Sequence, residues 1–361
     1  MAGADGRAAR GRGRLLRRRH RPAAGLGAPV VKRVRLGRSR VRVSGLGFGG
    51  AVIGNLYREV AEDTALAAVD AAWEAGVRYF DTAPHYGLGL AERRLGRALA
   101  DRPRDSYALS TKVGRLLVPR PDAAGQRDHA AGFDVPADHV RQWDFSADGV
   151  RRSLEESLRR LGVDRVDVVL LHDPDDHWEQ AVGEAYPVLH EWRDQGVVGA
   201  IGAGMNQWPM LERFVTETDI DAVMLAGRYT LLEQSASDTM LPECLRRGVS
   251  VLAAGVFNGG LLATDAQAPD AMYDYRPASR ELRAKAERMR EVCRAHGVSL
   301  PQAAIAFAAG HPAVAGVVLG MRSADEVVRN AELHARPVPR QLWADLVAAG
   351  LLRPDVTARD S

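Results

Sequence analysis

The chain has 361 residues, which is enough to bury a substantial core as one large α/β barrel or as two smaller domains. Hydrophobic residues make up 46% and charged residues 26%, the composition of an ordinary globular protein. No apolar run approaches the ~18 residues that span a bilayer, so we expect no membrane segment. The formal net charge is only +3, but the charges are unevenly distributed.

The positive charge is concentrated at the amino terminus, where residues 1–24 hold eight arginines against Asp5 alone. Such a run can serve as an arm that binds nucleic acid or an anionic surface. Leu15 and Leu16 are the only large apolar residues before Leu26, too few for the core of a signal peptide. We instead expect residues 1–30 to be a disordered extension, or the product of a misassigned start codon. Residues 31–361 are then one domain that binds no nucleic acid.

The two cysteines, Cys244 and Cys293, lie far apart and in no metal-ligand spacing. Each falls in an apolar pattern typical of a helix, which favours a small buried side chain. We therefore expect no disulfide framework, no metal site and a reducing, cytoplasmic location.

After the extension, the chain alternates strands and helices with unusual regularity. A hairpin is expected around the turn Gly37–Ser39, followed by a strand that opens at Gly45. Val31, Val34 and Leu36 belong to the first half of the hairpin and residues 40–44 to the second. Further strands are expected at 77–82, 107–113, 166–172, 197–203, 220–226, 249–254 and 314–320. Helices are expected at 62–76, 90–101, 146–162, 178–196, 207–218, 281–297 and 323–335, with a short one that ends at Gly248 and another from Pro301.

This order predicts the fold. Near-continuous apolar strands indicate a parallel sheet that helices cover on both faces. Eight strands, most of them followed by a helix, fit a (β/α)8 TIM barrel better than a doubly wound sheet. We expect such an α/β barrel with an N-terminal β-hairpin and a C-terminal extra helix. Two long segments, 114–145 and 256–278, follow strand ends at the face where barrel enzymes hold their sites.

Three glycines near the start, Gly45, Gly47 and Gly50, match the GxGxxG pattern of dinucleotide-binding folds. In those folds a helix opens directly at the glycines and directs its N-terminus at the pyrophosphate. Here the residues AVIGNLYREVAE intervene before the next expected helix, and a chain with 36 glycines meets the pattern easily by chance. We expect these glycines to allow close packing and a turn at the barrel mouth.

Four side chains capable of chemistry lie at or just beyond the ends of three successive strands. They are Asp81, Tyr86, Lys112 and His172, and in a barrel they can meet despite 91 residues of separation. Taken singly, Asp81 could form a turn, Tyr86 could be a loop aromatic and His172 a core histidine. Lys112 is harder to explain, because a buried ammonium needs a partner, and Asp81 on the adjacent strand offers one.

These residue types suit hydride transfer between a nicotinamide and a carbonyl carbon. Reduction leaves an oxyanion that takes up a proton, and the reverse reaction removes a proton from a hydroxyl. Tyrosine has an ordinary pKa near ~10, and a neighbouring lysine cation should lower that pKa towards neutrality. Asp81 would fix and balance Lys112, and a neutral His172 could donate a hydrogen bond that orients the substrate oxygen.

The segments around these residues, DTAPHYG, STKVGR and VDVVLLHD, resemble the catalytic segments of the aldo-keto reductases, and the similarity extends from about Val34 to about Leu333. The resemblance implies that Tyr86, Lys112, Asp81 and His172 are catalytic. GRYTLLEQ, the stretch around FNGGLLA, and MYDYRPAS resemble the branch that oxidises L-fucose and other D-threo-aldoses, with pyridoxal-oxidising members nearby. That branch converts a cyclic hemiacetal to a lactone.

The resemblance also implies a nicotinamide cofactor, NADP or NAD. Asn206 matches the position that contacts the nicotinamide amide, and Tyr229 matches the aromatic that stacks on the ring. LGMRSADEVVRN resembles the adenosine-phosphate pocket, with Gly320, Met321, Arg322, Ser323, Glu326 and Asn330 as its contacts. A helix N-terminus there favours an anion, although Ser323 could be a simple N-cap. Arg322 could grip a 2′-phosphate, but GMRS departs from the more common lysine-bearing form, which leaves the cofactor preference open.

Substrate contacts are expected from loops at the same face. Aromatic rings and a carboxylate suit a sugar, and the candidates are Tyr57, Trp143, Asp173 and Phe257. Asp173 could instead only begin the turn before Pro174. The leading interpretation is an NAD(P)-dependent dehydrogenase of a sugar hemiacetal, acting as a monomer or weak homo-oligomer. The alternatives are a general NADPH-dependent aldehyde or ketone reductase and a cofactor-sensing barrel subunit, although the intact set of four residues argues against a purely regulatory role.

Overall fold

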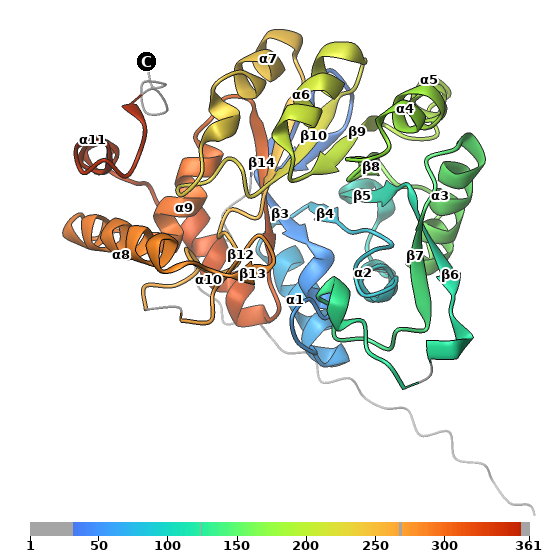
Figure 1. Ribbon diagram of the computed structural model, residues 1–361, viewed down its shortest axis with the longest axis horizontal. Coiled ribbons are helices and arrows are strands. Elements are labelled where there is room, and N and C mark those ends of the chain that lie inside the picture. The colour runs from blue at the N-terminus through green and yellow to red at the C-terminus, as the bar shows by residue number, and fades with distance from the viewer. Residues whose placement is uncertain (1–31, 124, 267–268, 355–361) are drawn as a thin grey trace, which may run out of the picture.

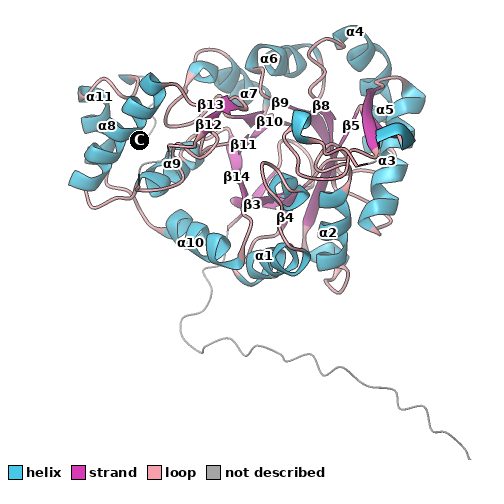
Figure 2. Ribbon diagram, turned by 60° about the horizontal axis from the view of Figure 1, so that its bottom comes forward, coloured by secondary structure: helices cyan, strands magenta, loops and turns pink. Residues whose placement is uncertain are grey.

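The computed structural model describes residues 32–123, 125–266 and 269–354, so the extension expected at residues 1–30, and Val31, lie outside it. Its centre is a closed barrel of eight parallel strands (Figure 2), which confirms the predicted fold class. Neighbouring strands follow chain order around the barrel. They are β3 (Leu46–Gly49), β4 (Tyr79–Asp81), β5 (Ala108–Val113), β8 (Val168–His172), β9 (Ala200–Met205), β10 (Ala222–Ala226), β11 (Ser250–Ala254) and β14 (Val314–Gly320).

Helices form a layer around the barrel (Figure 1). Several begin at a serine whose hydroxyl accepts a backbone N–H of the first turn, as Ser146 does from Gly149. The expected C-terminal extra helix is α11 (Arg340–Ala348), which packs beside α8 (Arg280–Ala295) (Figure 2). The others are α1 (Glu62–Glu74), α2 (Leu90–Leu99), α3 (Ala147–Leu161), α6 (Trp208–Glu217), α7 (Met240–Arg247), α9 (Leu300–Ala309) and α10 (Ala324–Ala335).

One expected helix, 178–196, is interrupted. It consists of α4 (Trp178–Gln180), a π-helical turn at Ala181–Ala185, and α5 (Tyr186–Asp194). Pro187 explains the break, because it has no N–H to donate four residues back and its ring crowds that carbonyl. The N–H of Tyr186 instead donates to the carbonyl of Ala181, five residues earlier.

The expected hairpin, β1 (Arg33–Arg35) and β2 (Arg42–Ser44), closes the end of the barrel where the strands begin. Leu36 and Val43 are fully buried and pack inside the barrel against Tyr79 and its neighbours. The turn approaches the barrel so closely that a Cβ on Gly37 would lie 2.0 Å from the carbonyl oxygen of Asp221. This end of the barrel is therefore filled with apolar side chains.

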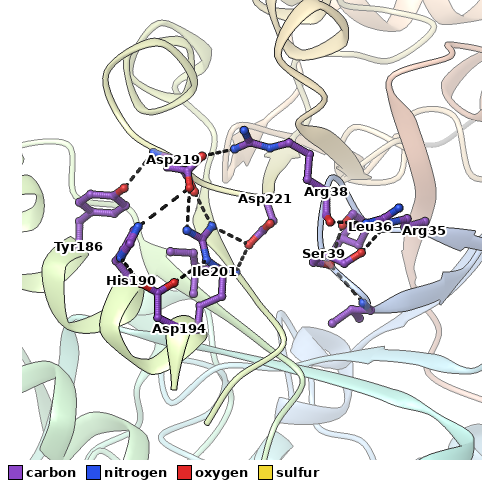
Figure 3. A network of polar contacts seen from close by, with 12 residues as sticks. Arg35, Leu36, Arg38, Ser39, Tyr186, His190, Asp194, Ile201, Asp219 and Asp221 are labelled. Atoms are coloured by element: carbon purple, nitrogen blue, oxygen red, sulfur yellow. Dashed lines mark hydrogen bonds and ion pairs between the residues drawn. The ribbon is translucent and has the colours of Figure 1, made fainter. Parts of the chain in front are cut away.

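Polar contacts tie the hairpin to the barrel (Figure 3). Arg38 forms an ion pair with Asp219, which also accepts from Arg193 at 2.8 Å. Arg193 reaches Asp221 at 3.2 Å, and that carboxylate accepts the backbone N–H of Ile201 on β9 at 3.0 Å. The network anchors the hairpin beside the start of β10.

Two of the three glycines that match GxGxxG, Gly47 and Gly50, allow the close packing expected of them, whereas a Cβ on Gly45 would meet nothing nearer than 3.7 Å. The chain forms a closed barrel, and β3 is followed by a 3-10 turn at Gly50–Gly54. A Cβ on Gly47 would lie 2.8 Å from the ring of Tyr79, and one on Gly50 would lie 2.8 Å from the carbonyl oxygen of Asp81. The dinucleotide-fold interpretation is therefore excluded.

The two long segments contain short hairpins that the sequence did not predict. Residues 114–145 include the antiparallel pair β6 (Arg115–Pro119) and β7 (His139–Trp143), and residues 256–278 include β12 (Met272–Tyr273) and β13 (Arg276–Pro277). The first segment is joined to the loop after β3, because the N–H of Tyr57 donates to the carbonyl of Gly132 at 2.7 Å. In the described parts of the chain, no helix is long and apolar enough to cross a membrane.

Candidate active site

A cavity of about 400 Å³ opens at the carboxyl ends of the barrel strands. The four residues expected from the strand ends, Asp81, Tyr86, Lys112 and His172, all line it. Both long segments contribute to its wall. Its other contacts come from the turn after β3, from the ends of β9, β10 and β11, and from the β14–α10 junction.

Lys112 is the centre of a fully bonded polar cluster. Its Nζ lies 2.7 and 3.0 Å from the two carboxylate oxygens of Asp81, 3.1 Å from the carbonyl oxygen of Thr82 and 3.0 Å from the hydroxyl of Tyr86. Lys112 and Asp81 are each only 2% exposed. Burial would lower the pKa of Lys112, but Asp81 and Tyr86 outweigh burial and raise it above its ordinary value. Lys112 is therefore a cation that donates to the phenol oxygen.

The neighbouring Lys112 cation alone should lower the pKa of Tyr86, but in the structure this pKa is raised. Burial raises the pKa of this phenol above its ordinary value, and the lysine cation opposes the rise only in part. Tyr86 is therefore held as a neutral phenol, a proton donor. The sequence revealed the lysine beside it but not the extent of its desolvation.

His172 lies edge-on to Tyr86, with ring centroids 5.9 Å apart, and edge-on to His85, at 5.6 Å. Burial lowers its pKa well below the ordinary value, and the cations of Arg115 and Lys112 add to the effect. His172 is therefore a neutral imidazole, as the proposed hydrogen-bonding role requires.

The four candidate substrate residues are placed differently from one another. Tyr57, Asp173 and Phe257 line the cavity. Trp143 does not: it is an exposed side chain whose ring covers the guanidinium of Arg115 at 4.1 Å. Its effect on a substrate would be indirect, through Arg115, which forms an ion pair with Asp173.

Most of the expected cofactor contacts also line the cavity: Asn206, Gly320, Arg322, Glu326 and Asn330. Asn206 donates to the carbonyl of Ala226 at 3.1 Å. Met321 and Ser323 lie outside the lining. The first is fully buried, and the second caps α10 by accepting the N–H of Glu326 at 3.3 Å.

Tyr229 is not positioned to stack on a ring in the cavity. It is buried against Phe307 of α9 and His311, with ring centroids 5.1 and 5.5 Å away, and is absent from the lining. Gly227, with a φ of +75°, turns the chain after β10, and Tyr229 then enters the packing between the barrel and α9. The residues that line this part of the cavity are Ala226 and Gly227 themselves.

Several lining residues were not predicted from the sequence. His85 precedes Tyr86 directly, and Arg329 shares a helix face with Glu326 three residues earlier, so a local signal existed for both. Phe133 and Tyr275 lie deep in the long segments, where no local pattern indicates that a residue faces a cavity.

The cavity fits a nicotinamide dinucleotide. Within the described residues, Arg322 Nε, Asn330 Oδ1 and Asn258 Oδ1 are buried without a hydrogen-bond partner, and all three residues line the cavity. Buried polar atoms are almost always bonded, so such a group indicates a polar ligand. The guanidinium groups of Arg322 and Arg329 and the first turn of α10 suit its phosphates. Among the residues described, no cluster of three His, Cys, Asp or Glu side chains could hold a metal ion.

Comparison with known proteins agrees with this geometry. The model of the Aldo/keto reductase family matches residues 45–350. D-threo-aldose 1-dehydrogenase of a Pseudomonas species is 46% identical, over 86% of this chain and 95% of that protein. Pyridoxal 4-dehydrogenase of Microbacterium luteolum is 34% identical, over 88% of this chain and 97% of that protein.

Solved structures share the fold as well. The holo form of an aldo-keto reductase from Bacillus halodurans has a TM-score of 0.71 and 25% identity, and the match covers 90% of this chain and 97% of that one. Glycerol dehydrogenase from Gluconobacter oxydans has a TM-score of 0.71 and 22% identity, over 91% and 95% of the two chains. The chain therefore belongs to the aldo/keto reductase family and is an oxidoreductase that uses a nicotinamide cofactor.

Proposed function

We propose that the enzyme is an NAD(P)-dependent aldose 1-dehydrogenase, which oxidises C1 of a cyclic sugar hemiacetal of the L-fucose or D-threo-aldose type to the lactone. The observation that carries the proposal is the contact of the Tyr86 hydroxyl with the buried Lys112–Asp81 pair inside the cavity. The 46% identity to D-threo-aldose 1-dehydrogenase supports the substrate class.

In this proposal each of the four residues has one task. In the oxidation direction Tyr86 must first lose its own proton, and its phenolate then takes the proton of the C1 hydroxyl; in the reverse direction the neutral phenol donates it. Lys112 stabilises the phenolate by donating to its oxygen. Asp81 holds Lys112 in place. Neutral His172 donates a hydrogen bond to the substrate oxygen and fixes its position. A bound nicotinamide supplies the acceptor for the hydride that leaves C1.

The remaining cavity wall suits a neutral sugar. The Asp173 carboxylate faces the cavity and can accept from a sugar hydroxyl, while its pairing with Arg115 balances its charge. Tyr57, Phe133 and Phe257 add aromatic surface that can cover the apolar face of a sugar ring.

The decisive assay incubates the protein with NAD⁺ or NADP⁺ and L-fucose, D-arabinose, L-galactose or pyridoxal, and follows the absorbance of the reduced cofactor. Both cofactors are needed, because Arg322 and Arg329 favour a 2′-phosphate and the Glu326 carboxylate opposes one. We expect turnover of at least one sugar. Reduction of simple aldehydes without sugar oxidation would favour the general reductase, and cofactor binding without any turnover would favour the sensing subunit.

The Tyr86→Phe variant tests the mechanism. Loss of the hydroxyl should lower kcat by about 10²-fold or more, because it removes the group to which the proton transfer is assigned. Cofactor affinity, measured by fluorescence titration, should be retained. A rate near that of the wild-type enzyme would contradict the assignment of Tyr86.

A further inference from the structure

Arg115 on β6 is a buried cation that the four-residue mechanism does not use. It follows Lys112 by three residues and is 8% exposed. Its Nη2 forms an ion pair with Oδ2 of Asp173, and the ring of Trp143 lies 4.1 Å from its guanidinium carbon. Ion pairing on one side and stacking on the other fix the planar group in one orientation.

Asp173, its partner, is held in a strained conformation beside His172. Its φ is +46°, which is unfavourable for a residue other than glycine, and its N–H donates to the carbonyl of Gly204 at 3.1 Å. The carboxylate Oδ2 lies 3.6 Å from Nε2 of His172. The same carboxylate oxygen is thus paired with the Arg115 cation and lies near the imidazole, beyond hydrogen-bond distance.

Charged and titratable groups from several elements act on the imidazole of His172. Asp173 lies beside it, His85 and Tyr86 after β4 contact its ring, and the cations of Lys112 on β5, Arg115 on β6 and Arg141 on β7 act on it electrostatically. Among these groups Asp173 is the anion in contact with the ring, and it would favour a charged imidazolium unless a cation balanced it. Nδ1 of His172 is buried without a hydrogen-bond partner among the described residues, whereas Nε2 faces the carboxylate.

We propose that Arg115 is a positioning residue: it fixes the Asp173 carboxylate beside His172 and balances its charge, so that His172 stays neutral with its proton on Nε2. The carboxylate selects the tautomer, since a proton on Nε2 faces a negative oxygen and a proton on Nδ1 would face no acceptor. The arginine prevents the same carboxylate from drawing a second proton onto the ring. The inference rests on the proposed function only in giving His172 the role of donor to the substrate oxygen.

The test measures the titration of His172 in the full-length protein without cofactor, by nitrogen-15 NMR of the imidazoles. The resonance is assigned by its loss in His172→Gln. In Arg115→Met we expect the titration midpoint of His172 to rise by about one to three pH units, as for an imidazole next to an unbalanced carboxylate. Arg115→Gln removes the same charge but can still donate to Asp173, so it provides a second neutral variant that should fold if the first does not.

Two controls separate this role from a structural one. Arg115→Met combined with Asp173→Asn removes both charges and should return the midpoint to the wild-type value. Arg127→Met breaks another arginine–aspartate pair of the same segment, with Asp134, and should leave His172 unchanged. An unchanged midpoint in both neutral Arg115 variants, or no return in the double variant, would overturn the proposal.

The pH dependence of kcat/KM supplies an independent measurement on whichever substrate the enzyme turns over. Arg115→Met should lose activity on the acid side of the new midpoint, by about tenfold per pH unit, and regain it above that midpoint. A purely structural role predicts a uniform loss at every pH. If the wild-type enzyme turns over no sugar, the proposed function fails, but the NMR titration still decides whether Arg115 controls His172.

Discussion

Replacing Lys112 with methionine tests the buried ion pair on which the site depends. In the variant, the hydrogen bond that the Asp81 carboxylate keeps within the described residues is the one from the Ser110 hydroxyl, at 2.8 Å, and the carboxylate is 2% exposed. Removing one partner of a buried ion pair typically costs about 3–5 kcal/mol, because the remaining charge is left without compensation. That is a large share of the total stability of about 5–15 kcal/mol of a typical domain.

The pH dependence identifies the cause. Without Lys112, burial should raise the folded-state pKa of Asp81 far above its unfolded value of ~3.9. A carboxyl group with a raised folded-state pKa holds its proton more tightly in the folded than in the unfolded protein. The free energy of unfolding therefore falls as the pH rises towards and through that folded-state pKa. Lys112→Met should therefore be destabilised less at about pH 5 than at about pH 8.

Urea unfolding at both pH values measures the loss. Lys285→Met is the matched control: Lys285 is half-buried and donates one hydrogen bond, to the carbonyl of Leu232 at 2.9 Å, so its loss should cost only about 1 kcal/mol. Combining Lys112→Met with Asp81→Asn should recover much of the stability but not the activity. A Lys112→Met protein as stable as the Lys285 control, or equally destabilised at both pH values, would refute the reasoning.

Three further predictions concern the proton donor, the cofactor and the turn beside Tyr86. Because burial raises the pKa of Tyr86, kcat for oxidation should increase with pH up to about 9 or beyond; a plateau near neutrality would contradict this. Glu326→Gln removes a negative charge from the phosphate end and should lower KM for NADP⁺ relative to NAD⁺, as initial rates with both cofactors would show. Gly87→Ala should cost about 1–3 kcal/mol in thermal unfolding and slow turnover, because φ is +60° and a Cβ would lie 2.2 Å from the carbonyl oxygen of Gly54. In contrast, Gly183→Ala meets nothing within 4 Å and should not reduce stability.

The barrel could be predicted because its strands are short apolar runs separated by helices with clear ends. The interior of a helix was harder to predict: the pattern of 178–196 is helical throughout, and only Pro187 indicates where the backbone changes to a π turn. The hairpin β6–β7 was missed because neither strand alternates polar and apolar residues: β6 is a short apolar run that ends at Pro119, and β7 is mostly polar and exposed.

The site residues that lie at the carboxyl ends of barrel strands could be predicted from the sequence. Asp81 and His172 are the last residues of β4 and β8, and Lys112 is the last but one of β5. The barrel topology alone therefore brings the three together. The position of Tyr229 depends on a turn at Gly227 and on packing against α9, which no local pattern reveals. The neutral state of Tyr86 depends on how completely loops from distant parts of the chain exclude water.

The hairpin β1–β2 closes one end of the barrel, and a molecule linked to the chain just before this hairpin would lie at that end. The backbone carbonyl of Lys32 accepts the N–H of Gly45 at the start of the barrel, the end opposite the cavity. A partner fused directly before Lys32, or a surface coupled there, joins the protein on the closed side. An immobilised form of the enzyme linked there would present its cavity to the solution.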